Sequence, residues 1–441
     1  MITSSAFSGK RYAVLGLARS GLAAAETLLA RGADVVAWDR QDNARAALEG
    51  RARLADPLEI DLAGFAGVVV SPGVPLNTHP IADRARAAGV PVIGDIELFA
   101  LARGDLPPHK VIGITGTNGK STTTALVRHL LESAGVPALM GGNIGLPILA
   151  QEPLPAGGVY VLELSSYQID LTVSLACDAA ALTNITPDHL DRYTGFEGYA
   201  ASKARLFAMQ QPGQFAVFGC ADEPTCAVQR EEAARRAPGR AVCMDTAAWV
   251  GGQPGWLSLQ GPHNLQNVAI AAALVAEIGL DRDQVLAGLA SFKGLAHRME
   301  PLGEHGGVLF INDSKATNPA STAPALAAFP PAPDKRVHWI CGGLPKGDGL
   351  EECEPFFGNV AAAYTIGEAG PRFAELLEPA MRVERCEMLC EAVQRAIAGA
   401  RAGDVVLFSP ACASFDQFRD YEMRGDAFRE VVNELTGQSA A

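Results

Sequence analysis

The stretch Gly113-Ile114-Thr115-Gly116-Thr117-Asn118-Gly119-Lys120-Ser121-Thr122 follows an apolar run at 111–115 and leads into a helix-forming segment. A strand followed by a glycine loop and a helix lets backbone N–H groups turn inward, and the helix N-terminus attracts anions. The pattern predicts a loop that holds a nucleoside triphosphate, with Lys120 on phosphate oxygens and Ser121 on Mg²⁺. Its glycines stand at 113, 116 and 119, and Ile occupies position 114 where the general P-loop has glycine, so this loop is a variant.

On both sides of this loop, apolar runs alternate with helix-like segments, which is typical of α/β folds. A chain of 441 residues predicts about three domains. The pair Pro107-Pro108 interrupts the pattern within an irregular stretch at 99–110, and a second break falls near Arg298. We therefore expect an N-terminal Rossmann-like domain at 1–93, a central P-loop ATPase with a mostly parallel sheet at 94–298, and a C-terminal Rossmann-like domain at 299–441.

Composition excludes some partners and environments. The net charge of −13 disfavours binding to nucleic acid or to an anionic membrane. The nine cysteines contain no CxxC pair, so we expect free thiols in a reducing cytosol, with neither zinc nor disulfides. The most apolar helical segment, 268–278, is too short to cross a bilayer. These features predict a cytoplasmic protein without membrane insertion.

The segment Gly16-Leu17-Ala18-Arg19-Ser20-Gly21, with Asp39 closing the next strand, is laid out like a dinucleotide fingerprint whose middle glycine is Ala18. That glycine normally lets a pyrophosphate approach the backbone, so its absence disfavours NAD and favours a ligand placed differently on the same helix N-terminus. Ser71-Pro72-Gly73-Val74 follows another strand of this sheet. It is either part of the same ligand site or a plain turn.

Three polar residues of the central segment are candidates for metal chemistry. Glu163 ends an apolar strand, where nucleotide-binding sheets place an acidic group beside the metal, although the following serines also suit a helix cap. His189 lies in a loop rich in carboxylates, where a structural histidine is the alternative. Lys203 lies in a helix, where a lone lysine is ordinarily a solvated surface charge.

Further polar groups follow strands or open a helix nearer the C-terminus. Asn264 and Asn267 either cap an Ala-rich helix or face a nucleobase. Loop groups also stand at the expected active edge of the last sheet: Arg298, Asp313, Lys315 and Lys346.

Taken together, these motifs resemble the Mur ligases of peptidoglycan synthesis, in order and along essentially the whole chain. The resemblance rests on the nucleotide loop, on Leu162 to Gln168, on Asn184 to His189, on His297-Arg298 and on Asn312 to Asn318. Within the family, Asn312 to Asn318 and Ser409 to Phe418 are similar to the members that ligate D-glutamate.

The resemblance implies ATP-dependent ligation of D-glutamate to UDP-N-acetylmuramoyl-L-alanine through an acyl phosphate, by a monomer. It implies catalytic roles for Lys120, Glu163, His189 and Lys203. It implies two Mg²⁺ ions, one on Ser121 and Glu163 and one on His189 and Lys203, with Lys203 carbamylated. The implied ATP-binding residues are Gly116, Thr117, Asn118, Gly119, Lys120, Ser121, Thr122, Asn264, Asn267, Arg298 and Asp313. Those for the UDP substrate are Leu17, Ser20, Asp39, Arg40, Ser71, Gly73, Asn143 and His189, and those for D-glutamate are Lys315, Thr317, Lys346, Ser414, Phe415 and Tyr421.

Two other functions remain open from the residues. A P-loop regulatory or transport ATPase would release phosphate whichever amino acid is present. Another amide ligase of the same family would respond to L-alanine or a diamino acid.

Overall fold

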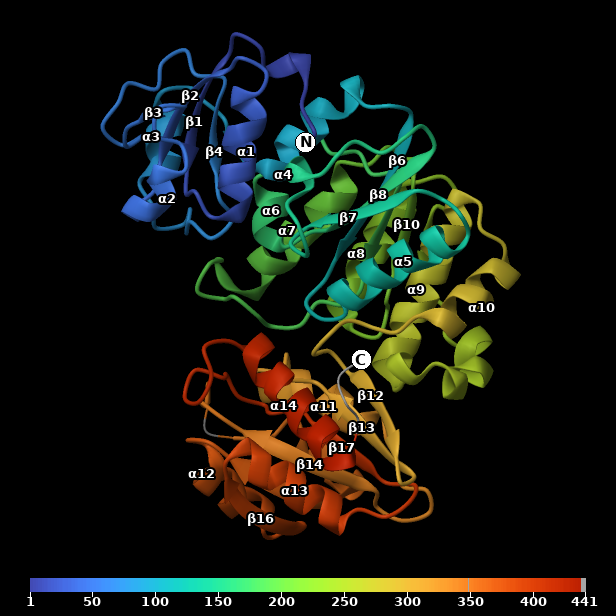
Figure 1. The fold of residues 1–441 in the computed structure, drawn as a ribbon. Coiled ribbons are helices and arrows are strands. Elements are labelled where there is room, and N and C mark those ends of the chain that lie inside the picture. Colours follow the sequence, from blue (N-terminus) through green and yellow to red (C-terminus); the bar gives the residue numbers. More distant parts are fainter. Residues whose placement is uncertain (348, 438–441) are drawn as a thin grey trace. The chain divides into compact units, whose positions relative to one another are not determined.

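The computed structural model describes residues 1–347 and 349–437. Three sheets follow one another along this part of the chain, each flanked by helices (Figure 1). The chain forms two compact units, one of residues 1–245 with 269–288 and one of 246–268 with the described residues from 289 onward. The predicted domain limits at 93/94 and 298/299 fall between the sheets, whereas the units divide after Asp245.

The first sheet has the order β3-β2-β1-β4-β5, and all its strands are parallel. They are β1 (Arg11–Leu15), β2 (Asp34–Trp38), β3 (Arg53–Leu54), β4 (Gly67–Val70) and β5 (Val92–Ile93), with helices α1 (Arg19–Leu29), α2 (Asp42–Ala46) and α3 (Ile81–Ala87). The strand order reverses between β1 and β4. Open α/β sheets bind ligands at such a reversal, so the loops after β1 and β4 are the expected site here.

The second sheet has the order β11-β10-β9-β6-β8-β7 and is also parallel throughout. It comprises β6 (His109–Thr115), β7 (Ala138–Gly142), β8 (Gly158–Glu163), β9 (Ala179–Leu182), β10 (Phe215–Phe218) and β11 (Ala241–Cys243). Its helices are α5 (Lys120–Ser133), α6 (Ser166–Asp170), α7 (Gly195–Ala208) and α8 (Glu223–Arg235), and α9 (Pro262–Ile278) and α10 (Arg282–Ser291) follow. β6 lies between β8 and β9, so the nucleotide loop emerges between the ends of these two strands.

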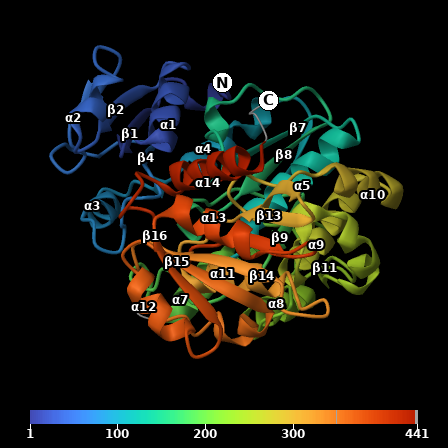
Figure 2. The same cartoon turned by 60° about the horizontal axis from the view of Figure 1, so that its bottom comes forward.

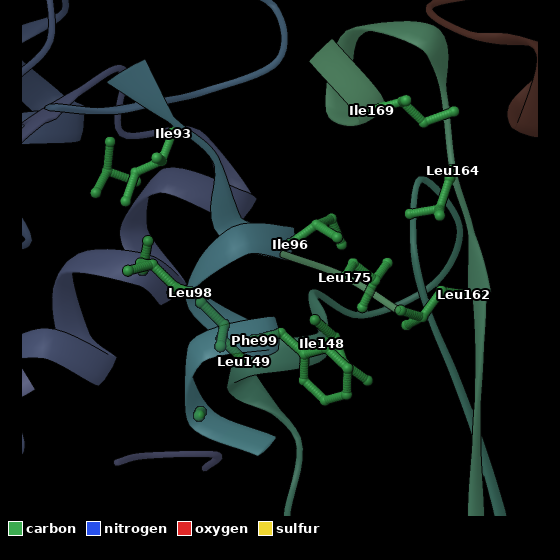
Figure 3. Packing of buried hydrophobic residues seen from close by; sticks show 14 of the residues in the cluster. Ile93, Ile96, Leu98, Phe99, Ile148, Leu149, Leu162, Leu164, Ile169 and Leu175 are labelled. Carbon is green, nitrogen blue, oxygen red and sulfur yellow. The ribbon is translucent and has the colours of Figure 1, made fainter. Parts of the chain in front are cut away.

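Helix α4 (Asp95–Ala102) links the first two sheets through one buried apolar cluster. Figure 3 shows Ile96 and Phe99 of this helix facing Ile148 and Leu162. The helix ends at Ala102, three residues into the stretch that we expected to be irregular from residue 99, because its apolar side chains are buried in this cluster.

The third sheet has the order β12-β13-β17-β14-β15-β16 (Figures 1 and 2). Its strands are β12 (Glu300–His305), β13 (Val308–Asn312), β14 (Val337–Gly342), β15 (Val360–Ile366), β16 (Arg382–Glu387) and β17 (Val405–Phe408). One buried cluster includes residues of α11 (Pro319–Ala327) and α12 (Gly370–Leu377), and a second includes residues of α13 (Leu389–Gly399) and α14 (Tyr421–Thr436). β12 pairs with β13 antiparallel, whereas the other strand pairs are parallel, as in the Rossmann-like domain that we expected. Gly306 and Gly307 form the turn between β12 and β13, so the two strands are antiparallel neighbours.

The structure also corrects the expectation for the cysteines. Cys220 and Cys243 form a disulfide, with Cα atoms 5.8 Å apart. Cys243 ends β11 and Cys220 lies just beyond β10, and these strands are neighbours in the parallel sheet. The spacing of 23 residues conceals this proximity in the sequence. Among the described residues, no helix is long and apolar enough to cross a membrane.

Candidate active site

The loop at residues 116–119 leaves β6 in a conformation that only its glycines adopt easily. Gly116 has φ +146° and Gly119 has φ +84°. A Cβ on Gly116 would stand 1.9 Å from Thr183 Oγ1, so a side chain there would push the loop away from the chain that follows β9. The loop is thus closely packed at the edge of the sheet, and α5 begins at Lys120.

Hydrogen bonds to the segment after β9 hold the loop in place. Thr117 N donates to Asn184 O at 2.9 Å, and Asn118 N donates to Asn184 Oδ1 at 2.9 Å. Thr183 Oγ1 in turn donates to Asn118 O at 2.6 Å. The loop is therefore organised by neighbouring protein groups. The sequence showed Asn184 only as part of a motif, without this role.

Two lysines converge on the same loop carbonyl. Lys120 Nζ donates to Gly116 O at 2.9 Å and to Thr117 O at 2.7 Å. Lys203 Nζ donates to Gly116 O at 2.7 Å. Lys203 is only 1% exposed, so its interpretation as a solvated surface charge is wrong. Burial first, and then the charge of Lys120, lower the pKa of Lys203 well below its ordinary value.

Glu163 lies beside this loop with one unpaired oxygen. It pairs with Ile114 in the β6–β8 ladder, and its Oε1 accepts from Asn143 Nδ2 at 2.8 Å. Its Oε2 is buried without a hydrogen-bond partner. A buried carboxylate oxygen without a donor is unfavourable unless a cation satisfies it. Ser121 is buried in the first turn of α5, and its hydroxyl is a suitable second oxygen ligand for Mg²⁺.

His189 is the remaining candidate metal ligand. It has φ +53°, is half-exposed, and its Nε2 lies 3.5 Å from Asp188 Oδ2. Its ring centroid lies 5.2 Å from that of Tyr167 and 6.4 Å from that of Tyr199. Within residues 1–347 and 349–437, no three His, Cys, Asp or Glu side chains gather as a metal-binding group. A metal here would need oxygen ligands of another kind, such as a serine hydroxyl or a modified lysine.

At the reversal of the first sheet, the loops after β1 and β4 touch. Ser71 Oγ donates to Gly16 O at 2.8 Å, and a Cβ on Gly21 would lie 1.8 Å from that carbonyl oxygen. The Asp39 carboxylate accepts from Leu17 N at 2.7 Å and from Gln41 N at 2.9 Å, so it shapes this loop. Other predicted substrate residues around these loops include Ser20 in the first turn of α1, the exposed Arg40, and Gly73. Asn143 stands apart from them, beside Glu163.

A cavity of about 570 Å³ adjoins the loop after β4. Arg192 crosses its wall, with Nη2 donating to Val74 O at 2.9 Å and its guanidinium 4.3 Å from the Tyr167 ring centroid. Asn77 Nδ2 also donates to Asp191 O at 2.9 Å. The loop after β4 is thereby joined to the loop that carries His189. Sequence reasoning assigned no role to Arg192, which has no signal beyond its place in that loop.

In the second unit, Asn264 and Asn267 lie buried in the first turns of α9. Asn267 Nδ2 donates to Asn264 Oδ1 at 3.1 Å, and Asn264 Nδ2 donates to Gln260 O at 3.0 Å. These bonds fix both amides at the start of the helix. The capping alternative from the sequence and the nucleobase alternative are both compatible with this arrangement.

Asp313 and Arg298 come together near the third sheet. Asp313 accepts from Ser409 Oγ at 2.8 Å and from Met299 N at 3.1 Å. Burial raises the pKa of Asp313 to about 7, despite these bonds and the nearby charge of Arg298. Arg298 stands between His297 at φ +62° and Met299 at φ +45°. This strained backbone directs the chain into β12.

Some of the residues predicted to bind D-glutamate contact one another. Lys315 Nζ lies 3.6 Å from the Tyr421 ring centroid, and Lys346 Nζ donates to Thr317 Oγ1 at 3.1 Å. Of the two residues in the loop after β17, Ser414 is buried, whereas Phe415 is 68% exposed.

Arg424, which sequence reasoning missed, organises the backbone around these residues. Its guanidinium is buried and donates to Ser314 O at 2.8 Å, Cys412 O at 3.0 Å and Ala413 O at 2.9 Å. One side chain thus joins the loops after β13 and β17. An arginine in a C-terminal helix carries no sequence pattern that would reveal these partners.

Comparisons with known proteins agree with this architecture. The family model described as the Mur ligase middle domain matches residues 114–247, and that described as the Mur ligase glutamate ligase domain matches 297–412. A protein of Novosphingobium aromaticivorans named UDP-N-acetylmuramoylalanine--D-glutamate ligase is 68% identical over 99% of this chain and 97% of its own length. A protein of the same name from Sphingopyxis alaskensis is 62% identical over 99% of this chain and 100% of its own length.

Solved structures share the fold at low identity. UDP-N-acetylmuramate-alanine ligase MurC of Thermotoga maritima is 16% identical, covers 97% of this chain and 99% of its own, and gives a TM-score of 0.56. MurF ligase of the same organism, solved in complex with ADP, is 16% identical. It covers 98% of this chain and 96% of its own, with a TM-score of 0.57. Matched by both family models and by nearly full-length relatives, the chain belongs to the Mur ligase family.

Proposed function

We propose that this chain joins D-glutamate to UDP-N-acetylmuramoyl-L-alanine, with ATP converted to ADP and phosphate. The observation that carries the proposal is the pair of polar side chains that lies beside the nucleotide loop. Glu163, with an unpaired carboxylate oxygen, and the buried Lys203 both lie beside that loop. The names of the relatives supply the substrate class.

The chemistry requires activation, because a carboxylate has no good leaving group. The alanine carboxylate oxygen attacks the γ-phosphorus of ATP, the bond to the bridging oxygen breaks, and ADP departs. The neutral amine of D-glutamate then attacks the acyl carbon. An amide forms, phosphate leaves with the carbon–oxygen bond electrons, and the amine proton is lost.

We infer that Lys120 serves the first step. In this structure its ammonium group donates to loop carbonyls at Gly116 and Thr117. We infer that it turns to the phosphate oxygens when ATP binds and offsets their charge, which would otherwise repel an anionic nucleophile. The other loop residues from Gly116 to Thr122 would contribute N–H groups, and Asn264, Asn267, Arg298 and Asp313 would hold the adenosine.

Ser121 and Glu163 would hold one Mg²⁺, and His189 with carbamylated Lys203 a second. Bound Mg²⁺ supplies positive charge that offsets the phosphate oxygens. The lowered pKa of Lys203 supports carbamylation, since its neutral amine can attack the carbon of CO₂ and lose a proton. The product is an N-carboxylate, which converts a cationic side chain into an oxygen ligand.

For the substrate sites we propose the residues that the family resemblance implies. We assign UDP-substrate contacts to Leu17, Ser20, Asp39, Arg40, Ser71, Gly73, Asn143 and His189. We assign D-glutamate contacts to Lys315, Thr317, Lys346, Ser414, Phe415 and Tyr421. The proposal also includes three domains at 1–93, 94–298 and 299–441, and a monomer acting in the cytoplasm, where ATP and nucleotide-linked sugars are made.

The deciding experiment measures phosphate release by purified protein with ATP, Mg²⁺ and UDP-N-acetylmuramoyl-L-alanine. D-Glutamate, L-glutamate, L-alanine and a diamino acid are added in separate reactions. Release with a ligated product only for the D isomer is the expected result. Release that ignores the amino acid would favour a regulatory or transport ATPase, and release with L-alanine or the diamino acid would favour another ligase of the family.

A further inference from the structure

Tyr199 of α7 lies between the nucleotide loop and Lys203, and no role has been assigned to it above. The side chain is 1% exposed, although it is one turn of helix before Lys203 and close to a half-exposed loop. Burial raises the pKa of Tyr199 to about 12, so its hydroxyl stays protonated at working pH. It can therefore act as a fixed hydrogen-bonding group.

The Tyr199 hydroxyl reaches the nucleotide loop. Its oxygen lies 3.2 Å from Thr117 Oγ1. That same Thr117 oxygen accepts from Thr186 N at 3.0 Å and lies 3.1 Å from Thr186 O. Thr117 is consequently the point where the loop, the chain after β9 and α7 meet.

The Tyr199 ring faces the second lysine. Lys203 Nζ lies 4.5 Å from the ring centroid and 2.7 Å from Gly116 O. At this distance the aromatic ring covers one side of the Lys203 amine and excludes water from it. Residues 116 and 117 are thus held by two side chains of one helix turn, Tyr199 through Thr117 and Lys203 through Gly116.

We propose that Tyr199 is a positioning residue whose hydroxyl sets Thr117 for nucleotide binding and whose ring shields and orients Lys203. The inference rests on the nucleotide role proposed above. The roles of the hydroxyl (the hydroxyl arm of the proposal) and of the ring (the ring arm) can be tested separately. Tyr199→Phe removes only the hydroxyl, and Tyr199→Leu removes the ring as well.

The hydroxyl arm is tested by direct binding of a non-hydrolysable ATP analogue with Mg²⁺, measured by calorimetry. Tyr199→Phe should weaken binding about fivefold, the loss of one neutral hydrogen bond. In a Thr117→Val background, the same substitution should change the Kd by less than twofold, since the partner oxygen is gone. Equal effects in both backgrounds would overturn this arm.

Tyr193→Phe is the matched control. Tyr193 lies 5.5 Å from Tyr199, ring to ring, and its hydroxyl donates to Asp170 Oδ2 at 2.9 Å, away from the nucleotide loop. It should leave the Kd of the analogue within twofold of the unsubstituted protein. If it weakens binding as much as Tyr199→Phe, the effect is not specific to Tyr199 and the proposal fails.

The role of the ring is tested by the reactivity of Lys203 toward an acetylating reagent in CO₂-free buffer, where the amine is not carbamylated, followed by peptide mass spectrometry. Tyr199→Leu should speed labelling at Lys203 at least tenfold, and Tyr199→Phe should leave it nearly unchanged. Equal labelling rates in the Leu variant and the unsubstituted protein would overturn this arm. Neither analogue binding nor lysine labelling requires ligation. If the protein binds the analogue but forms no amide, the proposed function is refuted, whereas the role of Tyr199 is still tested. Failure to bind the analogue would refute both.

Discussion

Asn143 Nδ2 donates to Glu163 Oε1 at 2.8 Å, and Asn143 N donates to Glu163 O at 2.8 Å. One residue after β7 therefore fixes both the backbone and the carboxylate at the end of β8. The bond occupies Oε1 of Glu163 and leaves Oε2 buried without a hydrogen-bond partner.

Asn143→Ala should weaken the apparent affinity for Mg²⁺ by about tenfold to a hundredfold, the usual effect of losing a group that orients a metal ligand. The measurement is a Mg²⁺ titration of phosphate release at saturating ATP and UDP substrate. A raised KM for the UDP substrate with an unchanged Mg²⁺ midpoint would contradict this orienting role.

Lys203→Met should abolish ligation without lowering thermal stability at pH 7, because it replaces a buried amine by an apolar chain of similar length. Between the lowered pKa and the ordinary value of about 10.4, the unfolded chain binds a proton that the folded chain lacks. Stability of the unsubstituted protein therefore rises with pH in that window, and the variant lacks this rise. Melting curves from pH 7 to 9.5 in CO₂-free buffer measure it, and parallel curves would refute the burial effect.

Asp313 should make the stability of the fold depend on pH in the opposite direction. Between its ordinary pKa of 3.8 and its raised value of about 7, the folded chain holds a proton that the unfolded chain lacks. Stability must then fall as pH rises through this window and stay lower above it. Asp313→Asn should flatten the profile of unfolding temperature between pH 4 and pH 8. A profile with the same slope as that of the unsubstituted protein would show that Asp313 is ionised throughout.

Arg424→Met should remove the side-chain donor from three backbone carbonyl oxygens, those of Ser314, Cys412 and Ala413, of which Ala413 O still accepts from Leu344 N. A buried carbonyl oxygen that loses its donor costs about 1–3 kcal/mol. We expect a lower unfolding temperature and a KM for D-glutamate that rises more than the KM for ATP. Arg424→Lys keeps the charge but not the planar guanidinium group. Its unfolding temperature and its KM for D-glutamate should lie between those of the unsubstituted protein and the Met variant. Equal increases in both KM values would argue against a specific effect on the loops after β13 and β17.

The sequence predicted the features that depend on local order. The apolar run at 111–115 lies within β6 (His109–Thr115), because a short apolar run beside a turn is a local signal. The nucleotide loop also follows from local glycine spacing. The structure brings Lys120, Glu163 and Lys203 to that loop, although their roles remain predictions.

Long-range contacts were beyond such reasoning. The burial of Lys203 depends on the carbonyl of Gly116, 87 residues earlier in the chain. Arg424 reaches Ser314, 110 residues away. The disulfide joins two strand ends whose adjacency is fixed by sheet order, not by the spacing of their cysteines. Each is decided by which strands lie side by side, information that no short window of sequence contains.

The position of β6 between β8 and β9 has a further consequence. Ile114 pairs with Glu163 on one side, and Thr115 pairs with Leu182 on the other. Successive side chains of a strand point to opposite faces, so a single inserted residue in β8 would turn Glu163 toward the other layer of helices. Many apolar side chains can replace one another along these strands at modest cost, whereas their residue counts cannot change. The tolerance of this enzyme to mutation should therefore be wide for substitutions within β8 and β9 and close to nil for insertions and deletions.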